Sequence, residues 1–518
     1  MGATNFTRRN FVKGGLVGGS LVAMAGLAAC SPASPEDKLS DTGSETEELV
    51  ADEEVETDIV IVGAGGGGLA AAVEAAEKGA SVIVLEANDK AGGNFDLTIG
   101  LMGVNSSMTK EEDRVDPMQI VATEVANAQY SVDSMKWKDL VDASAGNIDW
   151  LVDHGCKLTP PVAYLSDFAP VVYHMWPEGF TPASALIPAA EKAGAQFLLN
   201  TRGKQLITDD NGAVVGIFAE RKDGSILKVT AKAVILATGG WVNDEERMDR
   251  FAKGQHYYVR GAVDRPGDGI RMANEVGAHV TADQFHVMGW PALWIEHDMA
   301  WYNALLLSTQ GEALWVNQDG YRFTNEGLTR MMSSGPIIHA FLSQKQTYTI
   351  CDAGIADPIP GDLNPDTSVR QMLDGAVEDG ETRIWRADTF EELFQKAGVD
   401  SEVFLATVEQ YNRDCENGRD SMFGKDASML TKIATPPFYL VENTFYVSAT
   451  MANIDYDRSM RVVDLESNPI SGLYVAGVDG AQLYKSFYCL ETAGGSCNAN
   501  NIYSGRTAAQ TAIEDFSL

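Results

Sequence analysis

Short apolar runs separated by a helical pattern mark the first folded part of the chain. Residues 58–62 and 81–86 are rich in β-branched side chains, and residues 69–78 carry apolar positions at helical spacing. Uninterrupted apolar runs of this length are typical of parallel strands that are buried on both faces. The pattern therefore predicts a strand–helix–strand unit at residues 58–86.

A glycine-rich turn joins the first predicted strand to the helix, with glycines at Gly63, Gly65 and Gly68. In this spacing the first glycine permits a tight turn, the second lets the backbone approach a pyrophosphate, and the third allows close helix–strand packing. The N–H groups at the start of the helix would face the phosphates. Glu86 ends the second strand, where a carboxylate accepts hydrogen bonds from ribose hydroxyls. A plain glycine-rich turn has no use for this acid, so the unit predicts a dinucleotide site.

Glycine-bearing segments recur along the rest of the chain. Residues 233–240 form a buried apolar strand that ends in a glycine pair, and residues 267–269 open a helical segment. Near the C-terminus, residues 472–477 predict another strand that ends in glycine, and residues 494–496 precede a last helix around residues 501–515. The chain therefore carries candidate cofactor segments near both ends.

In their order, these segments resemble the flavoprotein family that contains soluble fumarate reductases, urocanate reductases and 3-ketosteroid dehydrogenases, over residues 57–518. The resemblance implies an α/β fold with FAD as the cofactor. A discontinuous Rossmann-like FAD-binding domain would span residues 57–287 and 452–518, with an inserted α+β clamp or capping domain at residues 288–451.

The resemblance also implies a set of FAD contacts. Val478 departs from the family, which commonly has an acidic residue there, and the neighbouring Asp479 is the candidate substitute. With the turn glycine Gly63 included, the predicted cofactor-binding residues are Gly63, Gly65, Gly67, Gly68, Glu86, Gly93, Asn94, Gly100, Leu101, Ala237, Asp268, Val478, Ser496 and Cys497.

Residues 320–330 resemble the family segment G-x-R-F-x-N-E-x-x-x-R, whose last arginine is here Arg330. In fumarate and urocanate reductases that arginine gives a proton to the substrate carbon while flavin N5 gives a hydride, so the resemblance implies this catalytic role. The alternative is a structural arginine that bridges the clamp. Because a guanidinium is a weak acid, tyrosine hydroxyls are second candidates. These are Tyr439, in a segment that resembles one in ketosteroid dehydrogenases, and Tyr302.

Several groups that bind a dicarboxylate or relay protons in fumarate reductases are replaced here. Leu306 and Thr309 occupy the relay positions, Thr492 replaces a carboxylate-binding arginine, and Ala449 replaces a histidine. A carboxylate without its arginine loses charge-assisted hydrogen bonds of about 1.5–3 kcal/mol each. We therefore expect a larger, flatter and less charged substrate than fumarate. The predicted substrate-binding residues are Thr492, Tyr488 and Trp290.

The first 29 residues predict a targeting segment. Arg8 and Arg9 form a twin-arginine pattern before an apolar run at residues 14–29, and Cys30 follows in a context that resembles the bacterial lipobox, where the cysteine is lipidated. The alternative is a transmembrane anchor, but the run is short for a span of ~20 apolar residues. Residues 30–56, rich in Ser, Pro, Thr, Asp and Glu, predict a disordered tether. The expected location is the outer face of the bacterial cytoplasmic membrane, reached by export and held by the lipid.

Charge and cysteine usage restrict the expected partners. With 39 Lys+Arg against 73 Asp+Glu, the formal net charge is −34, so the chain should repel nucleic acid and attract basic proteins. Six cysteines lack the spacing of iron–sulfur or zinc sites, and the sequence has no Cys-x-x-Cys-His haem motif. We expect no bound metal, and electrons from an external donor such as a membrane quinol-linked cytochrome.

These features predict an FAD-dependent oxidoreductase that reduces an activated carbon–carbon double bond in an enoate or enone. The hydride would come from flavin N5, and the proton from Arg330 or a tyrosine. Two alternatives stay open. One is a ketosteroid-type dehydrogenase that forms the double bond. The other is a non-catalytic lipoprotein that binds flavin or another ligand, which the missing proton relay would suit.

Overall fold

In the computed structural model, the helices and strands described below belong to the unit from Val50 to Leu518. The predicted signal at residues 1–29, the lipidation candidate Cys30, and the catalytic candidates Tyr302 and Arg330 lie outside the described residues. Within the described part, no helix is both long and apolar enough to cross a membrane. The structure describes residues 49–164, 169–259, 261, 263–281, 287–292, 311–328, 335–359, 367–451, 453–485 and 488–518.

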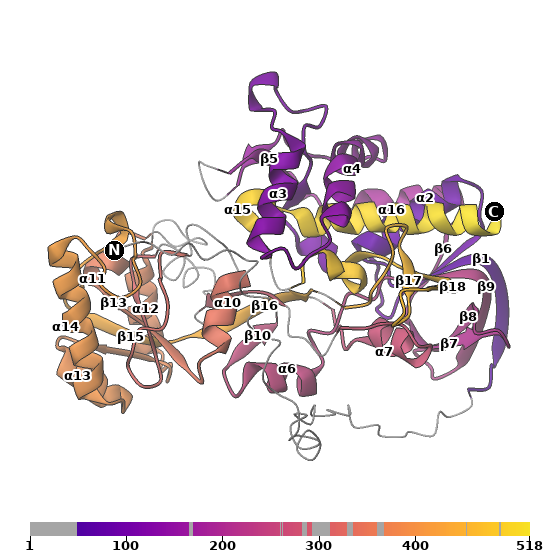
Figure 1. Ribbon diagram of the computed structural model, residues 1–518. Coiled ribbons are helices and arrows are strands. Elements are labelled where there is room, and N and C mark those ends of the chain that lie inside the picture. Colours follow the sequence, from indigo (N-terminus) through magenta and orange to yellow (C-terminus); the bar gives the residue numbers. More distant parts are fainter. Residues whose placement is uncertain are drawn as a thin grey trace, which may run out of the picture. The chain divides into compact units, whose positions relative to one another are not determined.

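An eight-stranded sheet lies at the centre of the predicted dinucleotide unit (Figure 1). Its parallel core has the strand order β18-β9-β1-β2-β6, and β17, β8 and β7 add antiparallel pairs at its margins. The apolar runs at residues 59–62, 82–85 and 233–236 are buried, as expected for strands covered on both faces. The strands are β1 (Glu53–Val62), β2 (Val82–Leu85), β6 (Gln196–Leu198), β7 (Thr201–Thr208), β8 (Val214–Arg221), β9 (Ile226–Leu236), β17 (Arg461–Val463) and β18 (Pro469–Val475).

Strand β1 begins at Glu53, so the last four residues of the predicted tether belong to the sheet. Residues 53–57 pair in register with residues 227–231 of β9. Ion pairs across this ladder join Glu54 to Lys228 and Asp58 to Lys232. Cross-strand partners thus stabilise polar positions that have no apolar pattern, and the folded region starts earlier than composition predicted.

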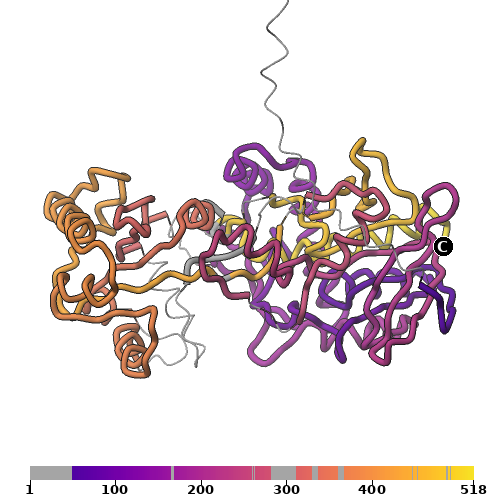
Figure 2. The backbone as a smooth tube through the Cα atoms, turned by 90° about the horizontal axis from the view of Figure 1, so that it is seen from below, coloured from indigo at the N-terminus to yellow at the C-terminus, as the bar shows by residue number. Residues whose placement is uncertain are grey.

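Two helices from opposite ends of the chain pack against each other beside this sheet (Figure 1). They are α2 (Gly66–Glu77) and α16 (Ser496–Phe516). A Cβ atom on Gly505 would stand 2.2 Å from the backbone oxygen of Gly67, so the crossing requires a glycine on α16. Farther along, Arg506 pairs with Glu74 at 2.8 Å. Figure 2 shows the same arrangement from below, with the yellow C-terminal segment among the indigo and magenta parts. The helices α5 (Ala183–Ala193), α6 (Glu245–Ala252) and α7 (Asp268–Glu275) complete this region.

A second group of helices has its own apolar core, which reaches the start of α16. Trp137, Leu140 and Val141 of α4 pack there with Ile120 and Val121 of α3. The elements of this group are α3 (Pro117–Asn127), α4 (Ser134–Asp153), α15 (Leu490–Ala493) and the three-stranded sheet of β3 (Gly100–Met102), β5 (Val171–Met175) and β4 (Val162–Ala163). Short 3₁₀ helices lie at Gly93–Leu97, Glu111–Asp113 and Gly477–Leu483.

A separate apolar core lies within the segment predicted as the clamp, between residues 313 and 441. In both views its orange residues gather apart from the indigo and yellow ones. The antiparallel sheet has the order β12-β13-β15-β14. Its strands are β12 (Leu314–Asn317), β13 (Thr347–Asp352), β14 (Ile384–Ala387) and β15 (Phe438–Glu442), and its helices are α11 (Ala353–Ala356), α12 (Val369–Glu378), α13 (Phe390–Ala397), α14 (Ser401–Asn417) and a 3₁₀ turn at Ala427–Met429.

A three-stranded sheet is built from both predicted domain segments. Its strands are β10 (Tyr257–Val259), β16 (Thr444–Thr450) and β11 (Val287–Ala292), and α10 (Gly335–Leu342) packs on it. The α/β fold class, with a parallel core and antiparallel margins, is confirmed. The exact division at residues 287/288 and 451/452 stays a prediction.

Candidate cofactor and substrate site

The glycine turn after β1 has the geometry that the motif predicted. Gly63 has a φ of +104°, and a Cβ there would stand 2.3 Å from the backbone oxygen of Ala237. A Cβ on Gly68 would stand 1.9 Å from the oxygen of Gly63, so both positions require glycine. Gly65 differs, because no atom lies within 4 Å of its Cβ position. The turn therefore opens into free space at Gly65.

This open space lies at the N-terminus of α2. Gly65 is the N-cap residue of α2, and no side chain caps the helix. The first N–H groups of a helix need partners and carry a partial positive charge. Gly93 borders the same region, since only the Cα of Gly65 lies within 4 Å of its Cβ position, at 3.6 Å. The arrangement suits a phosphate group.

Glu86 is buried at the end of β2 and faces the glycine turn. Its Oε2 accepts a hydrogen bond from the Ala64 N–H at 2.9 Å. Its Oε1 accepts from the N–H and side-chain amide of Asn88, at 2.9 and 2.7 Å. A carboxylate has about four acceptor sites, so these three bonds orient Glu86 and leave capacity for a ribose hydroxyl. Sequence reasoning missed Asn88, although its position two residues after the acid was a usable signal.

The predicted contacts Gly100 and Leu101 lie on β3 beside the start of α16. The Asn498 side chain donates to the Gly100 oxygen at 2.7 Å. A Cβ on Gly495 would stand 2.7 Å from the Leu101 Cα. This contact brings the predicted residues Ser496 and Cys497, at the N-terminus of α16, next to β3. Burial raises the pKa of the Cys497 thiol to about 12, so it stays protonated at neutral pH.

Gly67 proves to be a packing residue. A Cβ there would stand 2.8 Å from the Gly477 nitrogen, so glycine lets α2 approach the end of β18. Asn501 of α16 lies at the same junction, and its buried Oδ1 has no hydrogen-bond partner among the described residues. Sequence reasoning missed Asn501, which is an acceptor available to a hydroxyl of a bound nucleotide.

Asp479 does not replace the missing acid at Val478 as an exposed ligand. Its carboxylate is fully buried and accepts from the Thr238 N–H, the Thr238 hydroxyl and the Gly240 N–H, at 2.5, 2.8 and 2.8 Å. Burial raises its pKa against the effect of these bonds. Asp479 therefore holds the loop at residues 238–240 in place, directly after β9 and the predicted contact Ala237. The Val478 side chain packs against the apolar core of α3 and α4.

Asp268 begins α7 and forms an ion pair with Arg202 at 2.7 Å. Arg202 also approaches Asp264, at 3.5 Å. Sequence reasoning missed Arg202, because the pair joins residues that are far apart in the chain. The ion pair holds the start of α7 beside β7.

Aromatic rings lie beside the N-terminus of α16. The ring of Tyr484 meets those of Trp137 and Tyr488 edge to face, with centroids 5.4 Å apart in both pairs. Burial raises the pKa of both tyrosines well above the ordinary value. The buried Tyr484 hydroxyl has no hydrogen-bond partner among the described residues. The predicted residue Tyr488 thus lies near the start of α16, where the predicted FAD contacts Ser496 and Cys497 are.

Thr492, predicted to bind substrate, donates its hydroxyl proton to Oε1 of Glu124. Glu124 lies on α3, is only 2% exposed, and was not singled out from the sequence. The predicted residue Trp290 belongs to β11, but its side chain lies outside the described part, as do Tyr302 and Arg330.

The prediction of Tyr439 as a proton donor is not supported by its position. Tyr439 is fully buried in the core at residues 313–441, and its hydroxyl donates to Asp374 at 2.7 Å. Burial and the neighbouring carboxylate raise its pKa. A hydroxyl held in this way inside a core does not reach a substrate, so Tyr439 is a structural residue.

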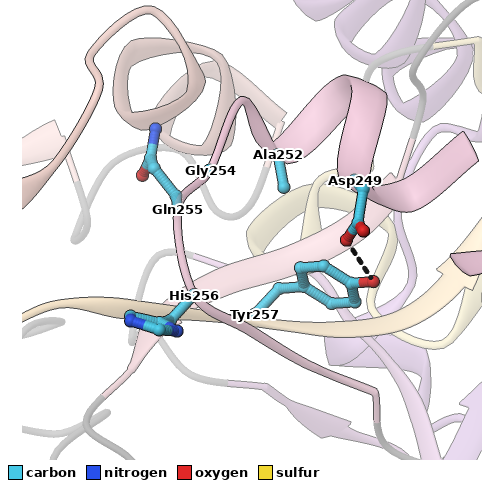
Figure 3. Close-up of a pocket in the computed structure, with 6 residues that line it drawn as sticks. All are labelled: Asp249, Ala252, Gly254, Gln255, His256 and Tyr257. Carbon is cyan, nitrogen blue, oxygen red and sulfur yellow. Dashed lines mark hydrogen bonds between the residues drawn. The ribbon is translucent and has the colours of Figure 1, made fainter. Parts of the chain in front are cut away.

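A cavity of about 360 Å³ lies elsewhere, beside α6 and β10 (Figure 3). The Tyr257 hydroxyl donates to Asp249 there at 3.2 Å, and burial together with this carboxylate raises the pKa of Tyr257 to about 12. The lining residues Asp249, Ala252, Gly254, Gln255, His256 and Tyr257 include no predicted site residue. The glycine turn, the two helix N-termini and Glu86 therefore remain the candidate cofactor site.

Comparison with known proteins agrees with this geometry. The family model described as FAD binding domain matches residues 58–494. A vinyl phenol reductase of Lactiplantibacillus plantarum is 30% identical over 483 residues, which cover 88% of this chain and 96% of the relative. A fumarate reductase (cytochrome) of Shewanella frigidimarina is 27% identical over 470 residues, which cover 88% of this chain and 77% of the relative.

Among solved structures, a 3-ketosteroid delta1-dehydrogenase from Sterolibacterium denitrificans matches with a TM-score of 0.70 and 20% identity. The match covers 89% of this chain and the whole of the other. At this identity the similarity shows a shared fold.

Proposed function

The chain belongs to the FAD-binding domain family and is an FAD-dependent oxidoreductase, and from this premise we propose that it reduces an activated carbon–carbon double bond. The observation that carries the proposal is the similarity to a vinyl phenol reductase along nearly the full length of both chains. The proposed substrate is an enoate, an enone or a vinyl arene, and a simple dicarboxylate is disfavoured because Thr492 stands in place of an arginine.

The described residues fit FAD. The uncapped N-terminus of α2 and the open space at Gly65 would hold the diphosphate, and Glu86 would accept from the ribose. Asn501, at the junction of α2 and the end of β18, would accept from a hydroxyl of the cofactor, and the N-terminus of α16 would hold the part next to β3. When bound, FAD supplies the two electrons of the reduction as a hydride.

The chain itself must supply a proton to the second carbon of the double bond. Arg330 is the proposed donor, at its guanidinium, and Tyr302 is the second candidate. A guanidinium that is desolvated beside the substrate would also stabilise negative charge as it develops.

Electrons would reach the protein from a separate donor. The net charge of −34 would attract a basic redox protein, such as a quinol-linked cytochrome. We further propose that twin-arginine export and lipidation at Cys30 keep the enzyme at the outer face of the membrane, close to such a donor.

The test is anaerobic mixing of the photoreduced protein with unsaturated acids, cinnamates, vinyl phenols and steroid enones, followed by flavin absorbance. We expect at least one of these compounds to reoxidise the flavin. A saturated analogue that bleaches oxidised flavin would instead indicate a dehydrogenase, and a panel without any effect would indicate a non-catalytic binding protein.

The proton donor is tested by Arg330→Ala, with Tyr302→Phe alongside. General acid catalysis contributes roughly 10²–10⁴-fold, so we expect Arg330→Ala to slow reoxidation by that factor while substrate still binds. Arg330→Ala turning over at the wild-type rate would remove the assignment, and a large effect of Tyr302→Phe alone would transfer it to Tyr302.

A further inference from the structure

Glu124 is an almost fully buried acid. It lies on α3 between Val121 and Val125, which belong to the core that α3 shares with α4 and the start of α16. A buried carboxylate is costly unless it is hydrogen-bonded. Thr492 of α15 supplies such a bond.

This hydrogen bond fixes the chemistry that Thr492 offers to a ligand. A threonine hydroxyl has one proton and two acceptor lone pairs. Because its proton points to Glu124, the Thr492 oxygen can only accept a further hydrogen bond. Thr492 is partly exposed, whereas Glu124 is not, so the threonine is the member of the pair that a ligand can meet.

The Glu124–Thr492 pair lies next to the predicted FAD contacts at the start of α16. Thr492 precedes Gly495 by three residues, and Gly495 abuts the Leu101 backbone. Ser496 and Cys497 follow directly at the start of α16. The aromatic rings of Tyr484 and Tyr488 lie on the same segment, beside Trp137. A flat ring bound here would meet an acceptor that is backed by a carboxylate.

We propose that the Glu124–Thr492 pair is a specificity device that selects substrates carrying a hydroxyl or another hydrogen-bond donor at this end and rejects those carrying a carboxylate. The inference rests on the proposed function and names its substrate class, a hydroxylated vinyl arene or a similar flat, neutral molecule. A carboxylate would meet an acceptor with no proton to give and a second carboxyl group behind it, so it should bind more weakly than a group that donates a hydrogen bond.

The test compares binding of three product-like probes that differ in a single group: 4-ethylphenol, ethylbenzene and 4-ethylbenzoate. Their dissociation constants for the oxidised holoprotein are measured by calorimetry, so that the readout does not depend on turnover. For the wild type we expect 4-ethylphenol to bind most tightly and 4-ethylbenzoate most weakly, with a separation of about tenfold or more. Equal affinities of the phenol and the benzoate, or no binding of any probe, would overturn the inference.

Glu124→Gln replaces the carboxyl group by an amide of the same shape, so it should raise the affinity for 4-ethylbenzoate by about tenfold and reduce the preference for the phenol. The matched control is Glu74→Gln, which neutralises another buried acid, bound to Arg506 and Gln510 between α2 and α16. It should lower the melting temperature without changing the ratio of the probe affinities. An unchanged ratio in Glu124→Gln would contradict the proposal.

Variants of Thr492 test the same proposal even if Glu124→Gln does not fold. Thr492→Ser keeps the hydroxyl and should keep the preference for the phenol, whereas Thr492→Val should lose it. Equal probe ratios in these two variants would also refute the proposal. Reoxidation of the reduced flavin by 4-vinylphenol is followed in parallel. If the probes bind in the expected order but 4-vinylphenol does not reoxidise the flavin, the proposed function is refuted and this selectivity stands.

Discussion

Gly65 and Gly68 stand three residues apart on one turn, but their surroundings require glycine for different reasons. At Gly68 the space for a Cβ is filled by the backbone oxygen of Gly63, at 1.9 Å. At Gly65 the space is empty and the backbone is extended, with φ −80°. Gly68 serves the fold, and Gly65 leaves room for a ligand.

This difference predicts opposite effects of two alanine substitutions. Gly65→Ala should leave the flavin-free protein as stable as the wild type or up to about 1 kcal/mol more stable, but should weaken FAD binding at least roughly tenfold because the methyl enters the phosphate space. Gly68→Ala should destabilise the flavin-free protein by about 1–3 kcal/mol through overpacking. Thermal melting and fluorescence titration with FAD separate the two effects. Wild-type FAD affinity in Gly65→Ala would show that the cofactor does not occupy this space.

At the scale of elements, a buried ionic cluster joins the segment after β12 to the loop after α14. The Arg322 guanidinium donates to Glu326 and Asp420, with its closest contacts at 2.8 Å, and the side chains are almost fully buried. Lys425 donates to the Tyr411 hydroxyl at 2.9 Å. Two cations thus face two anions, and loss of one member would leave a buried charge without its partner.

Asp420→Asn should therefore destabilise the core at residues 313–441 by about 3–5 kcal/mol at neutral pH. Burial alone would raise the pKa of Asp420, but the hydrogen bonds from Arg322 and from backbone N–H groups hold it well below the ordinary value. A depressed pKa contributes stability above the unfolded value, near ~4, that is lost as pH falls toward the folded value. The difference between wild type and Asp420→Asn should thus shrink below about pH 4, as urea unfolding at several pH values would show. A difference that does not change with pH would contradict this explanation.

Contacts within one strand–helix–strand unit could be predicted from the sequence, whereas contacts between distant segments could not. The turn at Gly63–Gly68 and the acid at Glu86 were predictable because their partners lie within one strand–helix–strand unit. The hydrogen bond from Tyr439 to Asp374 and the one from Thr492 to Glu124 join distant segments, and no local pattern indicates them. A polar residue in an apolar stretch shows that a partner exists, but only the fold shows which one.

The whole molecule carries a large excess of negative charge. The net charge of −34 produces self-repulsion in the compact state. In two of the described ion pairs, Lys396–Glu392 and Arg413–Glu409, both side chains are at least half exposed, and pairs of this kind contribute only about 0–1 kcal/mol. Repulsion should therefore outweigh these local attractions.

Salt should consequently stabilise the protein. Raising the ionic strength from ~0.01 M to ~1 M shortens the Debye length from about 30 Å to about 3 Å, which screens long-range repulsion more than close pairs. We expect the melting temperature of the holoprotein to rise by a few degrees over this range. Potassium chloride serves as the matched comparison for sodium chloride. A fall in the melting temperature in both salts would show that the ion pairs dominate.

The crossing of α2 and α16 at Gly67 and Gly505 also has a consequence for biogenesis. In the proposed FAD site, one side would come from α2, the first helix of the described residues, and the other from α16, the last. A nascent chain would therefore lack the α16 side of this site until residue 505 has emerged from the ribosome. Cofactor insertion would then follow synthesis of nearly the entire polypeptide, and chains that end before residue 505 should not retain FAD.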